Sequence, residues 1–256
     1  DDADIDGGPT VFTMRDVFDG IFHAAGASLD EHVSVRRATI LARHSWDSES
    51  VLDLFADPQQ SEAAIGDFAG ARAAAGYRAF LADTRRIYET LDRPMLRASK
   101  PSWPPALAWR IGLANLPDLA AIHPYTSMWK ALGRHFEDAR LRQLYARYAT
   151  YCGSSPFAAP ATLMLIAHVE AMGVWLIDGG MSALADGLQR LGAGCGAQYR
   201  FGEAVARVEL TGGRASGVIL AHGERIAADA VIANCDPAAI GAGLLGADAA
   251  GAVRSY

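Results

Sequence analysis

The sequence predicts an α+β protein in which short β-segments lie on both sides of a long helical region. Two stretches, 33–57 and 202–234, contain short apolar runs separated by polar or glycine turns, which is typical of strands and hairpins. Between 58 and 172, apolar residues recur at helical spacing. A strand, two glycines and a helix then follow at 173–191. We therefore divide the chain into the parts 1–57, 58–172 and 173–256.

Length and composition allow a sizeable core and exclude several classes of protein. The 256 residues are 51% hydrophobic, which excludes wholesale disorder. The net charge of -6 argues against a nucleic-acid partner, which would require a basic face. Cys152, Cys195 and Cys235 are far apart and form no CxxC pair, so neither a disulfide framework nor a metal site is expected. The most apolar run, 158–177, carries Glu170 near its middle and is a poor membrane span.

The first part, 1–57, is expected to contain one helix and a small sheet. Val17, Phe18 and Ile21 mark the apolar face of a helix that ends at Gly26. The polar turn 47–50 separates two apolar runs and therefore predicts a hairpin. The expected strands are 33–35, 40–46 and 51–55.

The second part, 58–172, is expected to be a helical subdomain inserted after the hairpin. Its clearest helix has an apolar stripe from Tyr77 to Leu91, and we expect Pro94 to end it, since proline breaks a helix interior. Further helices are expected at 105–114, 127–136, 138–151 and 160–172.

Segment 93–113 differs from its surroundings because basic residues are mixed with tryptophan and leucine in an otherwise acidic chain. Such a mixture suits a surface that rests on an anionic membrane, with tryptophan at the headgroups and arginine or lysine on phosphates. The alternative is a proline-rich loop with solvated charges and inward-packed tryptophans.

The third part begins with a glycine corner that is the strongest candidate for a ligand site. Val174–Ile177 predicts a strand, Gly179 and Gly180 form the turn, and apolar residues at helical spacing follow until Leu191. Two glycines let the backbone approach a ligand, and the first amides of the helix are expected to be free donors for it. The alternative is a turn without a ligand.

The rest of the third part predicts a β-meander and the start of a helix. Gly192 to Ala197 matches the GxGxxA form of a dinucleotide fingerprint, but it follows a helix and precedes a strand, the reverse of the required order. We therefore expect Gly192 to be a helix C-cap. The expected strands are 202–210, 215–220, 225–227 and a short buried strand 229–234, with a helix starting after 238.

Motifs for other chemistries do not occur in the sequence. It contains no GxSxG, HExxH or Walker loop, and its seven histidines are scattered. Paired acids that meet only in three dimensions remain possible. The catalytic residues therefore stay unknown at this point.

Four motifs, taken in order, resemble the bacterial phytoene-desaturase family of FAD-dependent carotenoid desaturases. They are most similar to the hydroxyneurosporene and methoxyneurosporene dehydrogenases, which are 1-hydroxycarotenoid 3,4-desaturases. The motifs are DGGPTVFTM at 6–14, YCGSSPFAAPA at 151–161, GVWLIDGGM at 173–181 and the discontinuous pattern from Gly217 to Pro237.

The resemblance implies a flavoprotein that transfers a hydride from a long apolar carotenoid to FAD. It also implies that 1–57 is part of a substrate domain, 58–172 a membrane-facing helical part, and 173–256 an incomplete FAD domain. Cytoplasmic localisation, peripheral to the inner or photosynthetic membrane, would follow, whereas the oligomeric state would not. The implied cofactor-binding residues are Gly179, Gly180 and Met181 near the flavin, Val205 near the adenine, and Asn234 and Asp236 near the dinucleotide.

The chain also departs from the family pattern. It lacks the opening strand, GxGxxG and helix, and it lacks the C-terminal glycine-rich flavin motif. The resemblance therefore implies an internal segment that binds FAD weakly or not at all and is inactive by itself. Two alternatives remain: a non-catalytic module that docks on lipid or membrane, and an FAD amine-oxidase-like enzyme that acts on another apolar substrate.

Overall fold

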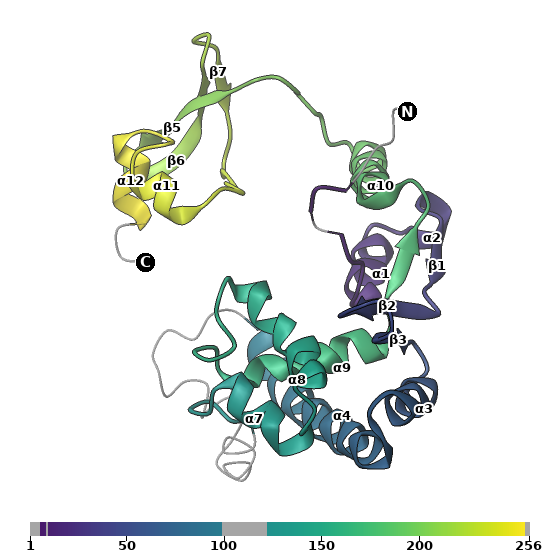
Figure 1. Ribbon diagram of the computed structural model, residues 1–256. Helices are drawn as coiled ribbons and strands as arrows, with labels where there is room; N and C mark the ends of the chain where they lie inside the picture. Colours follow the sequence, from purple (N-terminus) through teal and green to yellow (C-terminus); the bar gives the residue numbers. More distant parts are fainter. Residues whose placement is uncertain (1–5, 9, 99–121, 254–256) are drawn as a thin grey trace. The chain divides into compact units, whose positions relative to one another are not determined.

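A computed structural model describes residues 6–8, 10–98 and 122–253, and it confirms the α+β class (Figure 1). The chain forms two compact units, 1–195 and 196–256, which are treated separately below. The division lies after the helix that follows the glycine corner. The predicted third part, 173–256, is therefore shared between the two units.

The glycine corner belongs to a small α/β layer of the first unit. In this layer β1 and β4 pair antiparallel, with Val35 opposite Ile177, although they are far apart in the sequence. Phe22, Leu184 and Leu191 are buried beneath them. The elements are α1 (Arg15–Ala24), α2 (Leu29–His32), β1 (Val35–Arg37), β4 (Trp175–Ile177) and α10 (Gly180–Gly194).

Two predictions for this layer need correction. The first strand begins at Val35 instead of residue 33, because Val33 ends α2 and is buried in the core of the layer. Gly192 is not the C-cap of its helix. Helix α10 continues to Gly194, Cys195 is the C-cap, and Gly196 has the positive φ of 94° that typically follows a helix end.

The predicted hairpin is confirmed. Strands β2 (Ile40–Ser45) and β3 (Val51–Phe55) pair antiparallel, with Arg43 opposite Asp53. Asp47 closes the connection because its Oδ1 accepts from the backbone N–H groups of Glu49 and Ser50 at 2.9 and 2.6 Å.

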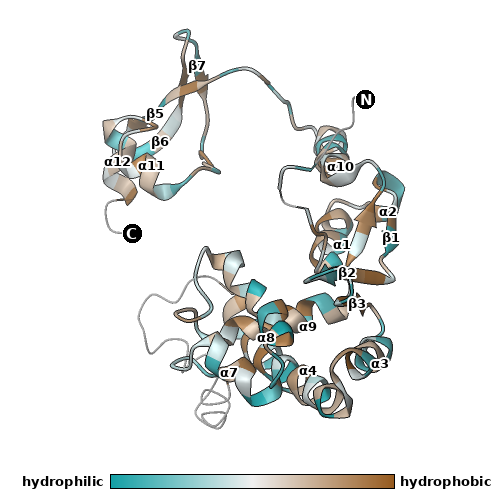
Figure 2. Cartoon of the chain, viewed as in Figure 1, coloured by the Kyte–Doolittle hydropathy of each residue, from teal (hydrophilic) through white to brown (hydrophobic). Residues whose placement is uncertain are grey.

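The helical part packs around one large apolar core. Phe80, Leu132 and Tyr145 are among its fully buried side chains. Figure 2 shows hydrophobic residues along much of α9 and in β4. The long elements are α3 (Pro58–Ala69), α4 (Ala71–Leu91), α7 (Met128–His135), α8 (Ala139–Ala146) and α9 (Leu165–Met172).

Helix boundaries in this part differ from the predicted ones. Pro94 lies inside a π-helical turn, Asp92–Leu96, that continues from the end of α4 at Leu91. The predicted helix 138–151 is α8 followed by the 3₁₀ turn Arg147–Cys152. The last predicted helix starts as a 3₁₀ turn, Ala161–Met164. The predicted helix 105–114 lies outside the described residues.

A close approach between α4 and α7 depends on Gly76. A Cβ atom at this position would overlap the carbonyl oxygen of His135 at the end of α7. The two helices can therefore pack at this distance only because α4 carries no side chain there.

A partly buried ion pair lies at the helical core, with the Glu170 side chain 11% exposed and the Arg147 side chain 28% exposed. Arg147 donates through Nη2 to both carboxylate oxygens of Glu170, at 2.9 and 2.7 Å, and the Tyr148 hydroxyl donates to Oε2 at 2.7 Å. Burial raises the pKa of Tyr148, and the Glu170 charge raises it further. Each partner therefore compensates the desolvation of the other.

The second unit is a three-stranded antiparallel sheet with two short helices. The strand order is β5 (Val205–Thr211), β6 (Arg214–Leu220), β7 (Arg225–Ala227), which agrees with the predicted meander except that the first strand begins at Val205 instead of residue 202. Helices α11 (Pro237–Gly241) and α12 (Ala247–Val253) follow, and Leu220 and Ala250 are buried.

The predicted buried strand 229–234 is wrong. The segment has no regular structure, and Ile232 is 96% exposed. A strand needs a neighbouring strand that pairs with its backbone N–H and C=O groups. The last residue before the segment, Ala228, still donates its N–H to the Ser216 carbonyl, but in the described part of the unit no strand pairs with residues 229–234.

We predict that Gly76→Ala destabilises the chain despite the higher helix propensity of alanine. Propensity alone would favour alanine by about 1 kcal/mol, but the overlap with His135 should cost about 2 kcal/mol or more. Urea unfolding followed by circular dichroism measures the difference. Gly20→Ala is the matched control, because Gly20 lies in α1 with open space beside it and should gain stability. Equal effects of the two substitutions would contradict the close approach.

We predict that Glu170→Gln lowers the free energy of unfolding by about 3 kcal/mol, because it leaves the Arg147 charge without its partner in the core. Glu89→Gln is the control. Glu89 pairs with Arg85 at the surface, one helical turn apart, and should change stability by less than about 0.5 kcal/mol. Thermal and urea unfolding of both variants give the comparison. A cost at position 170 no larger than that at 89 would show that the core pair contributes nothing.

Candidate functional site

The strongest candidate site is the turn between β4 and α10. Gly179 and Gly180 have φ angles of 87° and 77°, a left-handed conformation that glycine adopts without strain. Gly179 is exposed and serves as the N-cap position of α10, but without a side chain it provides no cap. The local sequence therefore explains the turn and leaves the end of the helix to be capped from elsewhere.

That cap comes from Asp6. The N–H of Met181 donates to Asp6 Oδ1 at 2.9 Å and to Oδ2 at 3.0 Å. The expectation that the first amides of this helix are free for a ligand is therefore wrong at Met181. A carboxylate is favourable here because the N-terminal end of a helix carries partial positive charge.

Two further contacts fix the strand side of the turn. The Trp175 N–H donates to the Phe12 carbonyl at 2.9 Å, and Phe12 is buried. Ser34 donates through its hydroxyl to Asp178 Oδ2 at 2.6 Å. The turn is thus attached to residues before α1 and to the residue before β1.

The geometry of the turn can be compared with the parts of a flavin cofactor. Among the residues that the structure describes, a side chain at Gly179 would meet only Ala183, at 3.4 Å, and Ser182 is also exposed, so one edge of the backbone is open toward them. An open backbone edge fits a flat ring. A phosphate bound by the Met181 amide does not fit, because the Asp6 carboxylate already takes that donor. The residues present therefore fit the ring system of a flavin and not its pyrophosphate.

The other predicted cofactor residues lie in the second unit. Val205 starts β5 opposite Leu220, and Asn234 is exposed in the irregular segment before α11. Asp236 caps α11, because its Oδ1 accepts from the Ala238 N–H at 2.8 Å. The six predicted residues are therefore divided between the two units: Gly179, Gly180 and Met181 are consecutive in the first, and the other three lie in the second.

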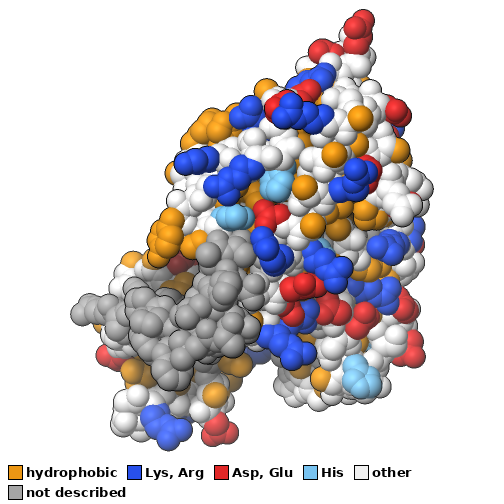
Figure 3. Space-filling model, turned by 90° about the horizontal axis from the view of Figure 1, so that it is seen from below, with side chains coloured by type: hydrophobic (Ala, Val, Ile, Leu, Met, Phe, Trp, Pro, Cys, Tyr) orange, Lys and Arg blue, Asp and Glu red, His pale blue; other side chains and the backbone are white. Residues whose placement is uncertain are grey.

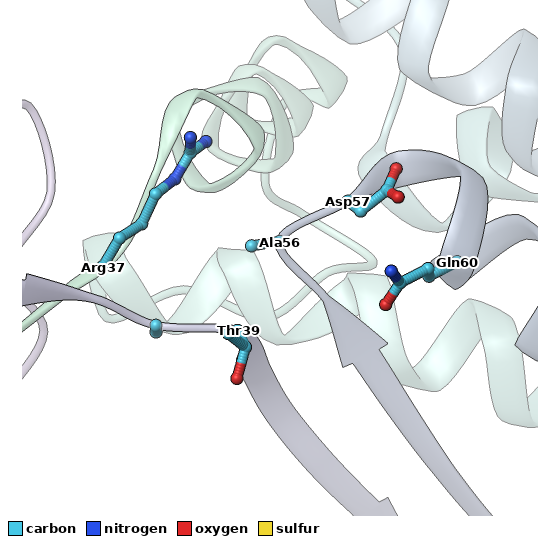
Figure 4. Close-up of a pocket in the computed structure, with 6 residues that line it drawn as sticks. Arg37, Thr39, Ala56, Asp57 and Gln60 are labelled. Carbon is cyan, nitrogen blue, oxygen red and sulfur yellow. The ribbon is translucent and has the colours of Figure 1, made fainter.

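An open pocket of about 290 Å³ lies between the β1–β2 connection and the start of α3 (Figure 4). Figure 4 shows the Arg37 guanidinium on one side and Asp57 with Gln60 on the other. Arg37 donates to the Met172 carbonyl at 3.3 Å, and Asp57 accepts from the Gln59 N–H. Because charged and amide groups line it, this pocket does not suit an apolar chain.

A cluster of two histidines and one aspartate was not found by sequence reasoning. Asp83 Oδ2 lies 3.3 Å from His123 Nε2 and 3.2 Å from His135 Nε2. Burial raises the pKa of Asp83, but the two histidines lower it more, so the net shift is downward. The three positions are far apart in sequence, and no spacing signal connects them. In the part of the chain that the structure describes, no group of three such residues is arranged to hold a metal ion.

Comparisons with known proteins identify the family to which the chain is similar. The family model for flavin containing amine oxidoreductase matches residues 40–255. Hydroxyneurosporene desaturase of Rubrivivax gelatinosus is 46% identical over 96% of this chain and 47% of its own length. The protein of the same name from Cereibacter sphaeroides is 45% identical over 94% and 48%. Phytoene desaturase (lycopene-forming) of Pantoea ananas is 31% identical over 90% and 46%.

The chain thus spans about half the length of these curated relatives. The match to the family model extends over most of the chain and includes the glycine turn, α10 and the second unit. The resemblance found in the four motifs is confirmed by these comparisons. The chain belongs to the flavin-containing amine oxidoreductase family.

Proposed function

We propose that the chain is part of an FAD-dependent carotenoid desaturase that acts on a hydroxy- or methoxyneurosporene-like substrate. The observation that carries the proposal is the naming of three relatives, 46, 45 and 41% identical over nearly the whole chain, as hydroxyneurosporene desaturases. In such an enzyme FAD supplies the two-electron acceptor. The activity belongs to the whole protein, and this segment alone is expected to be inactive.

The residues of this chain would act by binding and orienting. Gly179, Gly180 and Met181 would present the open backbone edge to the ring. Val205, Asn234 and Asp236 would lie near the adenine and dinucleotide. Support for the first group comes from the positive φ angles and the open side of the turn. Positioning of substrate against cofactor needs no protein base within these residues.

The main alternative is an amine-oxidase-like enzyme that acts on another apolar substrate. The family description supports it, because it names amine oxidoreduction. The higher identity to the carotenoid desaturases favours the first proposal.

A second proposal concerns docking on a membrane, through a surface that we call the 93–98 patch. Within the predicted segment 93–113 only residues 93–98 are described. Met95 is 47% exposed and Leu96 is 39% exposed, with Arg93 exposed beside them. Arg97 bonds Asp16 at 2.7 Å, which brings the patch to α1. Exposed apolar side chains next to cations favour an anionic lipid surface.

Figure 3 shows one face of the chain on which Lys and Arg side chains are spread among exposed hydrophobic ones. None of the described helices has the length and apolar composition that crossing a membrane requires. We therefore propose peripheral attachment, on the cytoplasmic side of the inner or photosynthetic membrane.

The desaturase proposal predicts that this chain can replace the matching half of the Rubrivivax gelatinosus relative. The chimera should purify with about one FAD per chain and convert hydroxyneurosporene, because it would combine this chain with the half of the relative's length that the chain does not span. Visible absorbance and pigment chromatography measure both properties. The isolated chain 1–256, mixed with FAD, is the control and should bind weakly or not at all. A folded chimera without flavin would refute the proposal, and flavin reduction by an amine but not by a carotenoid would favour the alternative.

The membrane proposal predicts that the chain sediments with anionic vesicles and is released by high salt, because salt screens the arginine–lipid attraction. Met95→Ser combined with Leu96→Ser should weaken binding by about tenfold, since two apolar side chains no longer enter the lipid. Ile40→Ser is the control, because Ile40 is 43% exposed and lies on β2, outside the patch. An equal loss for both variants, or equal binding to neutral vesicles, would contradict docking through the 93–98 patch.

A further inference from the structure

Asp6 caps helix α10 through the Met181 N–H, which lies 175 positions later in the sequence. Other helix-capping aspartates in the described chain act locally. Asp57, Asp138 and Asp236 each accept from the backbone N–H two residues further on, at 2.7 to 2.9 Å. At α10 the N-cap position is Gly179, which has no side chain. The cap is therefore supplied by a distant residue, and the local position stays open.

Gly180 is required by this arrangement for two reasons. Its φ of 77° strains any residue with a side chain, and a Cβ atom there would lie 2.8 Å from Asp6 Oδ1. The carboxylate thus occupies the space that a side chain at 180 would fill. Asp6 and Gly180 form one structural unit at the end of the helix.

The segment that carries Asp6 holds the turn at both ends. Asp6 bonds Met181 on the helix side, and the Phe12 carbonyl accepts from Trp175 on the strand side. Phe12 is also packed edge-on against the Trp175 ring, with 6.3 Å between the ring centres. Asp6 and Phe12 therefore hold the helix side and the strand side of the turn, and with them the direction of the open backbone edge.

We infer that Asp6 is a positioning residue for the flavin-facing turn, an inference that rests on the proposed function. Its carboxylate fixes the glycine turn through the Met181 amide. It also takes the amide that a phosphate would otherwise bind, so that the ring and not the pyrophosphate lies against the turn. Finally, it adds one fixed negative charge near the ring, which disfavours reduction of the flavin.

The test uses the full-length protein that contains this segment, as wild type and as the variants Asp6→Ala, Asp6→Asn and Asp57→Ala. FAD affinity, the visible flavin spectrum, the reduction potential and the melting temperature are measured for each. Asp57→Ala is the matched control, because it removes a cap of the same kind from α3. Melting temperatures of the two alanine variants should fall by similar amounts.

Asp6→Ala should weaken FAD binding by roughly tenfold, because a turn that is no longer held populates the competent conformation less often. Asp6→Asn keeps a side-chain acceptor and should retain FAD affinity within about twofold of wild type. Both Asp6 variants should shift the flavin potential to a more positive value, whereas Asp57→Ala should leave affinity, spectrum and potential unchanged. If Asp6→Ala does not fold, the potential and spectrum of Asp6→Asn decide.

Two results would count against the inference, and they can be told apart. Wild-type protein that binds no flavin would overturn the proposed function and this inference with it. Wild-type protein that binds flavin, with Asp6 variants whose affinity, spectrum and potential match those of Asp57→Ala, would overturn the inference alone.

Discussion

Strand β4 is the constraint on which the rest of the first unit depends. It is only three residues long, yet it pairs with β1, bonds Phe12 through Trp175, and leads directly into the glycine turn. Three segments that are distant in sequence therefore meet at one short strand. Closing such long loops costs conformational entropy, which burial of Phe12, Phe22 and Leu184 beneath the layer offsets. These long-range contacts therefore determine the geometry of the candidate site.

Features encoded by local sequence could be predicted, and features encoded by distant contacts could not. The hairpin with its turn at Asp47, the helix stripe from Tyr77 to Leu91 and the Gly179–Gly180 turn all follow from patterns within a few residues. The cap from Asp6 to Met181 has no local signal, because Gly179 stands where a capping side chain is normally found. The glycine pattern indicates an open turn, and only the structure shows which donor is already used.

The wrong strand at 229–234 has a related cause. Its apolar sequence indicates burial, but burial needs a neighbouring surface, and Ile232 has none among the described residues of its unit. The predicted cofactor residues likewise depend on neighbours that the sequence order does not reveal. Val205 and Asn234 belong to one unit and Gly179 to the other, so the position of each residue is determined by contacts within its own unit. Sequence order places the six residues in one list, whereas the structure places three of them in each unit.

Three glycines lie where another part of the chain comes too close for a side chain, two between packed helices and one at the candidate site. At Gly76 and Gly187 the missing side chain brings two helices together, and Gly187 would otherwise place a Cβ atom 2.5 Å from Val33. At Gly180 the missing side chain admits a carboxylate instead of a helix. The physical rule is the same in all three places, but the consequence differs. At Gly76 and Gly187 the end of another helix fills the space of the missing side chain, and the two helices pack closely. At Gly180 the Asp6 carboxylate fills that space, the neighbouring Gly179 is exposed, and the turn carries a fixed charge. The turn is therefore held by Asp6 on its helix side and exposed at Gly179.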